Sequence, residues 1–284
     1  TLLALATSVE FDSVGRLHAL WGADQILRTD PEVQEPSLKS LRPLLQDTDD
    51  VLRAAAAKVA GERLDLGAVA HLRELLSDPS PRVQYFSILA LAQLEDVDAF
   101  PGVVGRLASA ENEDAALRHA GIMYLVSLRD PTKIATLRKH PSESVRRAAV
   151  VALRRLKMKE TSLFLDDESD LVVMEAARAI HDEPIPSAMN ALADMVGTSD
   201  GSKELLRRVL NANYRLGTAE SAAKLAAFAS RESAVPEMRI EALEMLGKWA
   251  QPDPRDRVLN AHRPLAEREA LVAKKALDPH VDSL

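Results

Sequence analysis

A histidine and an aspartate stand side by side at the end of a helix-like run. His181 and Asp182 lie in the stretch EAARAIHDEPI (175–185), and Pro184 follows two residues later. Such a pair can belong to a catalytic triad or to the ligand shell of a metal. Both sites need a further partner, and the neighbouring sequence supplies neither a nucleophile nor a second ligand. We therefore favour a structural role at the C-terminus of a helix, where a histidine can bond to the last carbonyls.

The rest of the chain carries no local motif for catalysis or metal binding. Its seven histidines are spread out, and no two are spaced four residues apart as on a zinc-binding helix. The absence of cysteine excludes disulfides, thiolate metal sites and attached c-type haem within this stretch. The GxGxxG, GxSxG, HExxH and Walker patterns are also missing. We expect no catalytic residue, no cofactor and no metal in this segment.

A run of basic residues at 138–159 could form a groove for anions or nucleic acid. Glu143 is the only acidic residue in this run. A reader of single-stranded nucleic acid also needs aromatic side chains for stacking, and the sequence has none between Tyr124 and Phe164. The net charge of −7 also disfavours a phosphate-binding protein. We interpret the run as a solvated helix face and expect no nucleic-acid partner. Its basic members are Arg138, Lys139, Arg146, Arg147, Arg154, Arg155, Lys157 and Lys159.

The composition indicates an all-α protein. Hydrophobic residues make up 46% of the 284 positions, but aromatic residues only 4%. Alanine and leucine dominate and favour helices, whereas a β-sandwich would need β-branched and aromatic residues. No apolar run reaches the roughly 20 residues that cross a bilayer, so we expect no membrane insertion. The chain starts at Thr1 without a methionine, and we expect it to be a piece of a longer protein.

One helical pattern recurs about every thirty residues. In SVRRAAVVALRRL (144–156), apolar residues fall at offsets 0, 3, 4, 7, 8 and 11 from Val145, which is one stripe on a helix. A shorter apolar helix and a polar turn such as DPSP (78–81) precede most copies. In the copy that starts at Val173, His181 takes the offset-8 position, which is leucine in other copies. The copies are anchored near residues 15, 52, 83, 117, 145, 173, 206 and 238.

These blocks resemble the HEAT repeat family. The Asp/Pro turn, the Val-Arg entry and the Ala-Ala core carry the resemblance, as in DPSPRV (78–83) and PSESVRRAAVVAL (141–153). The resemblance implies an all-α, right-handed α-α superhelix (a HEAT-like solenoid) of about eight helix pairs. We expect a single repeat array over 1–284, with the second helices lining the concave face. Residues 253–284 would cap the array or start a further repeat, and within them PLAEREALVAKKALDPHVDSL (264–284) would form a charged helix.

Four stretches look like a narrower group, the planctomycete-type membrane-bound dehydrogenase proteins. In that family a β-propeller precedes a HEAT array, and a CxxCH haem domain follows it. The resemblance implies an exported, periplasmic parent protein, of which this chain would be only the non-catalytic HEAT section. No redox residue of that family maps onto this sequence. The stretches are RLHALWGADQIL (16–27), LVVMEAARAIHDEPIP (171–186), LLRRVLNANYRLGTAESAAKLAAFA (205–229) and EALEMLGKWAQPDPRDRV (241–258).

The function predicted from these patterns is a scaffold that binds proteins or the neighbouring domains of its parent. Two alternatives stay open, a stand-alone interaction adaptor and a nucleic-acid enzyme of the HEAT-like glycosylase kind. We expect the chain to be a monomer in solution. We expect Trp21 to fill the core of the first repeat; the alternative is that it lines a ligand groove or a docking site. Trp249 has the matching place at the other end. The possible interaction residues are His18, Trp21, Arg118, Arg147, Arg154 and Trp249.

Overall fold

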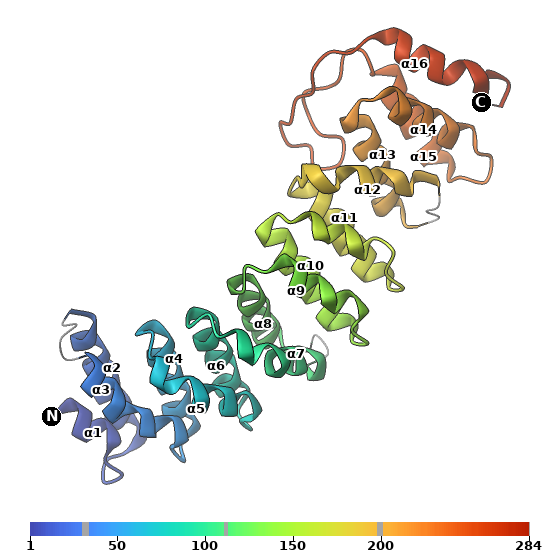
Figure 1. The fold of residues 1–284 in the computed structure, drawn as a ribbon. Coiled ribbons are helices and arrows are strands. Elements are labelled where there is room, and N and C mark those ends of the chain that lie inside the picture. Colours follow the sequence, from blue (N-terminus) through green and yellow to red (C-terminus); the bar gives the residue numbers. More distant parts are fainter. Residues whose placement is uncertain (30–33, 111–112, 198–200, 284) are drawn as a thin grey trace. The chain divides into compact units, whose positions relative to one another are not determined.

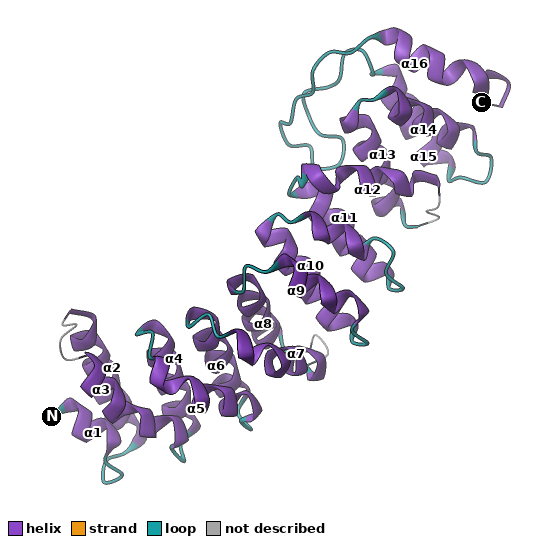
Figure 2. Ribbon diagram, viewed as in Figure 1, coloured by secondary structure: helices purple, strands orange, loops and turns teal. Residues whose placement is uncertain are grey.

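The computed structural model describes residues 1–29, 34–110, 113–197 and 201–283. Within these ranges the chain forms α-helices and short 3₁₀ turns, and the only strand-like feature is an isolated bridge between Arg255 and His262 (Figure 2). The all-α class is therefore confirmed. No helix in the same ranges is both long and apolar enough to span a bilayer.

The chain divides into two compact units, Thr1–Ala152 and Leu153–Leu284. The boundary falls within α10 (Glu143–Leu156), the helix of the basic run. Each unit is built from helix pairs and is described by itself. The single array over 1–284 stays a prediction.

In unit 1 the second helix of each pair lies beside the next one, because α2 packs on α4, α4 on α6 and α6 on α8 (Figure 1). These four second helices are α2 (Ser13–Thr29), α4 (Asp50–Glu62), α6 (Pro81–Gln93) and α8 (Ala115–Ser127). The first helices are shorter and often run on into a 3₁₀ turn. They are α1 (Leu2–Thr7), α3 (Gln34–Leu41), α5 (Val69–Glu74), α7 (Phe100–Ser109) and α9 (Pro131–Ala135). The predicted anchors near 15, 52, 83 and 117 all fall in second helices.

The polar turns start the second helices as the sequence indicates. The Asp49 carboxylate accepts the N–H of Val51 at 2.8 Å, and Asp114 caps α8 in the same way. At DPSP, Pro81 takes the first turn of α6, but the carboxylate of Asp78 accepts the N–H of Ser80 before the helix begins. Each second helix therefore begins at a fixed place in its repeat.

The turns that follow α4, α6, α8 and α10 have a conformation that the sequence does not reveal. After α4, Leu64 adopts a positive φ of 54°, and the N–H of Asp65 donates to the carbonyl of Ala60 at 2.8 Å. This is a Schellman-type ending, which usually has glycine at the left-handed position. Here larger side chains stand at that position in four successive repeats. They are Leu64, Glu95, Arg129 and Lys157.

Small residues let the second helices come close. A Cβ added to Gly61 on α4 would lie 2.6 Å from the Cα of Ala90 on α6. Ala57 on α4 is fully buried, and so is Leu91 on α6. The predicted small and apolar stripe is therefore the contact surface between successive second helices.

Unit 2 is also built from packed helices and contains a long irregular segment before its last helix. The helices packed against one another include α11 with α13, α12 with α13, and α14 with α15 and α16. Residues 248–269 form an irregular segment, here named the strap. The charged helix predicted over 264–284 is therefore shorter, because α16 begins at Ala270 and gives way to a 3₁₀ turn after Leu277. The helices are α11 (Asp170–Asp182), α12 (Met189–Asp194), α13 (Lys203–Leu216), α14 (Ala219–Ser230), α15 (Pro236–Gly247) and α16 (Ala270–Leu277).

Candidate functional site

His181 occupies a core position at the end of α11 and is fully buried, as its place in the repeat predicts. Its Nδ1 lies 2.8 Å from Oδ1 of Asp182, and its Nε2 lies 2.9 Å from Nδ2 of Asn211 on α13. An amide nitrogen can only donate, so Nε2 accepts and the ring proton sits on Nδ1. The ring therefore does not cap the carbonyls of its own helix, which corrects that part of the expectation. Instead it joins α11 to α13.

Asp256 of the strap reaches the same buried cluster. Its side chain has no exposed surface, and Oδ1 accepts the N–H groups of Val258 and Leu259 at 2.9 and 3.0 Å. Oδ2 accepts Nδ2 of Asn211 at 3.2 Å, and it pairs with two guanidinium groups. These belong to Arg215 at 3.1 Å and Arg263 at 3.4 Å. Burial opposes ionisation of Asp256, but the two N–H groups and nearby cations outweigh it and lower the carboxyl pKa.

Asp182 stands at the outer edge of this cluster. Burial opposes its ionisation, but hydrogen bonds from His181 and Arg208 outweigh burial and lower its pKa to about 2. The Arg208 guanidinium holds both carboxylate oxygens, at 3.1 and 2.8 Å. The carboxylate is therefore charged at neutral pH and ties α11 to α13.

The arrangement suits a structural role, which is to hold α11, α13 and the strap together, rather than catalysis. Both ring nitrogens of His181 are already used, and the ring is closed to solvent, so a substrate has no path to it. The described residues contain no group of three or more side chains that could hold a metal ion. The sequence pointed to His181 and Asp182 but missed Asn211 and Asp256. One signal was available, since Asn211 stands where α4 and α6 carry buried apolar residues.

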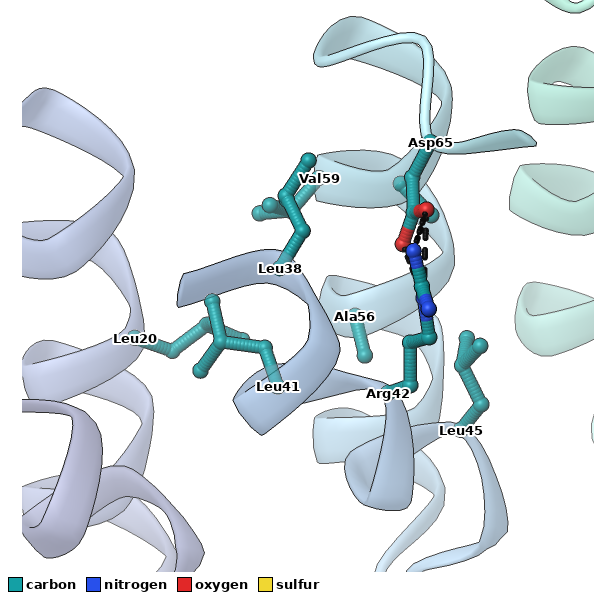
Figure 3. A pocket seen from close by; sticks show the side chains of 9 residues that line it. Leu20, Leu38, Leu41, Arg42, Leu45, Ala56, Val59 and Asp65 are labelled. Carbon is teal, nitrogen blue, oxygen red and sulfur yellow. Dashed lines mark hydrogen bonds and ion pairs between the residues drawn. The ribbon is translucent and has the colours of Figure 1, made fainter. Parts of the chain in front are cut away.

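A small cavity in unit 1 is also unsuited to a ligand. It has a volume of about 10 Å³, roughly the space of one water, and lies among leucines of α2, α3 and the following 3₁₀ turn (Figure 3). Arg42 closes one side and donates to both carboxylate oxygens of Asp65, with a shortest contact of 2.6 Å. This pair joins the first helix of one repeat to the turn after the second helix, which is again a structural role.

Trp21 does not fill the core of the first repeat, and that expectation is wrong. Its side chain is 50% exposed on α2, and its ring stacks on His18 with centroids 5.5 Å apart. The buried residue of that turn is Leu20 instead. The structure thus favours the alternative, in which His18 and Trp21 lie on an accessible surface.

Trp249 behaves in the opposite way and is only 1% exposed. Its ring meets the edge of Tyr214 at 6.0 Å, and the guanidinium of Arg268 covers it at 4.7 Å. The expectation of an interaction residue at Trp249 is therefore corrected, because Tyr214 and Arg268 already cover its ring.

The three predicted arginines lie on different helices or are already paired. Arg118 is half-buried on α8. Arg147 lies 3.8 Å from Glu143 on its own helix. Arg154 pairs with Glu183 at 3.1 Å and is 3.6 Å from Glu175. These contacts do not bring the three arginines together into one site. The ion pairs of Arg154 agree with a solvated helix face.

A more continuous surface exists on the second helices of unit 1. On α2, α4 and α6 the side chains at offsets −1, +3, +6 and +10 from each anchor are exposed or half-buried, and the helices lie side by side. We name this surface the second-helix face. Its residues are Val14, His18, Trp21 and Gln25 on α2, Val51, Ala55, Lys58 and Glu62 on α4, Arg82, Phe86, Leu89 and Gln93 on α6, with Met123 at the same register on α8.

Comparison with known proteins agrees with the repeat pattern. Residues 38–116 match the family model described as HEAT repeats. No curated protein sequence matches the chain.

The chain is also similar to three solved structures. An archaeal HEAT-like repeats protein from Thermococcus onnurineus NA1 is 14% identical, with 97% of each chain covered and a TM-score of 0.42. The complex of CpcE and CpcF of phycocyanin lyase from Nostoc sp. PCC7120 is 20% identical, with 85% of this chain and 94% of that chain covered and a TM-score of 0.38. Human deoxyhypusine hydroxylase is 15% identical, with 99% and 94% covered and a TM-score of 0.32.

Proposed function

We propose that the chain is a non-catalytic HEAT-repeat scaffold that binds other proteins through the second-helix face. The observation that carries the proposal is the exposure of Trp21 on this face. Large apolar side chains gathered on one surface mark interaction sites, and tryptophan is enriched among the residues that dominate binding energy. Phe86 and Leu89 are half-buried on the same face, two helices away.

The wider setting of the chain is a second part of the proposal. Its resemblance to exported dehydrogenase-like haem proteins suggests a HEAT section that positions a propeller and a cytochrome outside the cytoplasm. The flanking sequence of the parent gene tests this part. A parent without a propeller or a CxxCH segment would leave the stand-alone adaptor.

Selection from a displayed library of random peptides tests protein binding directly. We expect the chain to enrich a family of related peptides, and Trp21→Asp or Phe86→Asp to abolish their binding. Leu66→Asp is the matched control, because Leu66 is 75% exposed but lies on a first-helix turn outside the face. Thermal unfolding of each variant checks that the fold is retained. Failure to enrich any peptide, or equal binding by all three variants, would refute the proposed function.

A further inference from the structure

The second-helix face has a regular geometry that limits what can lie across it. The offset +6 positions of successive helices carry Trp21, Lys58 and Leu89, which form one row. Packed helices lie about 8–10 Å apart. An extended chain advances about 3.3 Å per residue, so a peptide crossing the helices meets a new one roughly every three residues. A short extended segment can therefore contact the whole row.

The apolar members of the face offer two separate anchor points. Trp21 presents half of its surface and is held flat against His18. Phe86 lies on α6, with its ring edge-on to Tyr85 at 5.0 Å. Both are aromatic rings already fixed by a neighbour, so binding costs them little side-chain entropy.

The charged members of the face are mainly cations without strong acidic partners. The Lys58 side chain is 52% exposed, and its Nζ is 3.8 Å from Glu62, which Arg28 holds more closely at 2.8 Å. Arg82 is exposed, lies 6.0 Å from the centroid of Phe86 and forms no ion pair within the described ranges. A chain with a net charge of −7 thus presents positive charge beside the exposed ring of Trp21 and the half-buried ring of Phe86.

We propose that the second-helix face binds an acidic peptide segment with bulky apolar side chains. Its carboxylates pair with Lys58 and Arg82, and its apolar residues pack on Trp21 and Phe86. The inference rests on the proposed function and adds the chemistry of the partner. Cations beside aromatic rings also suit single-stranded nucleic acid, but the net negative charge of the chain opposes its approach.

Fluorescence anisotropy with a labelled peptide that alternates glutamate with leucine and tryptophan tests the inference. We expect saturable binding that weakens as salt rises. Lys58→Glu, Arg82→Glu and Trp21→Ala should each weaken binding roughly tenfold or more, the effect of about 1.4 kcal/mol. Lys39→Glu is the matched control, since Lys39 is exposed on α3 and its replacement makes the same charge change outside the face.

The outcomes separate this inference from the proposed function. The inference is overturned if a peptide with lysine in place of glutamate binds more tightly, or if a single-stranded oligonucleotide displaces the acidic peptide at low salt and binds more tightly. It is also overturned if Lys39→Glu weakens binding as much as Lys58→Glu. If the displayed library instead yields neutral or basic peptides that need Trp21, the protein-binding function stands and only the acidic partner is wrong.

Discussion

Replacing Asp256 with alanine should release the strap while the helix pairs stay folded. The substitution removes one carboxylate that accepts two backbone N–H groups and an Asn211 amide. It also leaves Arg215 and Arg263 without their shared counter-charge. Breaking a buried ion pair from one side costs about 3–5 kcal/mol. Both arginine side chains keep 16% exposure and can turn toward water, so we expect the lower end, about 3 kcal/mol.

Hydrogen exchange read by mass spectrometry measures this loss where it occurs. The strap contains backbone bonds that depend on its closed form, such as Asp256 N–H to Ala261 and Arg263 N–H to Pro254, both 2.9 Å. A loss of about 3 kcal/mol in local opening free energy predicts exchange that is faster by roughly a hundredfold. Peptides from α11 and α13 should change much less.

Two further variants make the interpretation specific. Asp253→Ala removes an exposed carboxylate that accepts only the N–H of Arg255, and it should change strap exchange less than fivefold. Asp256→Asn keeps the shape but not the charge and should fall between the two. Unchanged strap exchange in Asp256→Ala, or the same change in Asp253→Ala, would refute the assignment of Asp256 as the anchor.

Three other predictions follow from buried groups. His181→Leu should lower the free energy of unfolding by about 1–3 kcal/mol, because Asn211 loses its ring acceptor; unchanged or raised stability in urea titrations would contradict the structural role of His181. Asp182 has a folded pKa of about 2 against an ordinary 3.8, so its ionised form stabilises the fold above about pH 4. That contribution, on the order of 2 kcal/mol, should fade as the pH falls from about 4 toward 2, and Asp182→Asn should remove this part of the pH dependence. Gly61→Ala should destabilise the chain by about 1–3 kcal/mol because its Cβ meets the backbone of α6, whereas Gly105→Ala on α7 meets nothing within 4 Å and should stabilise by up to about 1 kcal/mol. The melting temperature should fall in Gly61→Ala and rise in Gly105→Ala. Equal changes in the two variants would count against the close approach of α4 and α6.

The repeat pattern was the most predictable feature, because it depends on local chemistry. Apolar residues spaced three and four apart specify a helical stripe, and Asp or Pro specifies where the helix begins. All eight predicted anchors fall in helices of the described structure. The buried position of His181 followed from the same register.

The local pattern could not predict the surroundings of the two tryptophans or the hydrogen-bond partners of His181. Asn211 is 30 residues from His181, and Asp256 is 45 residues from Asn211, so only the folded chain brings them together. The sequence pattern predicts a core position for Trp21 in the first repeat and the matching place at the other end for Trp249. In the structure Trp21 is 50% exposed, whereas Tyr214 and Arg268 cover the ring of Trp249.

The left-handed residues Leu64 and Glu95, which follow α4 and α6, also mark the ends of a segment that can be duplicated or deleted as a whole. From Leu64 to Glu95 the backbone leaves two successive helices with nearly the same φ, 54° and 52°. The backbone therefore runs in a similar direction at the start and at the end of the 31-residue segment 65–95. Duplicating or deleting this unit would join two turns with similar φ and the same backbone hydrogen bond, from Asp65 to Ala60 and from Asp96 to Leu91, and would preserve the register of the helices on either side. Duplication or deletion of a gene segment can therefore change the number of repeats by one at a time, and the existing turns serve as the connections.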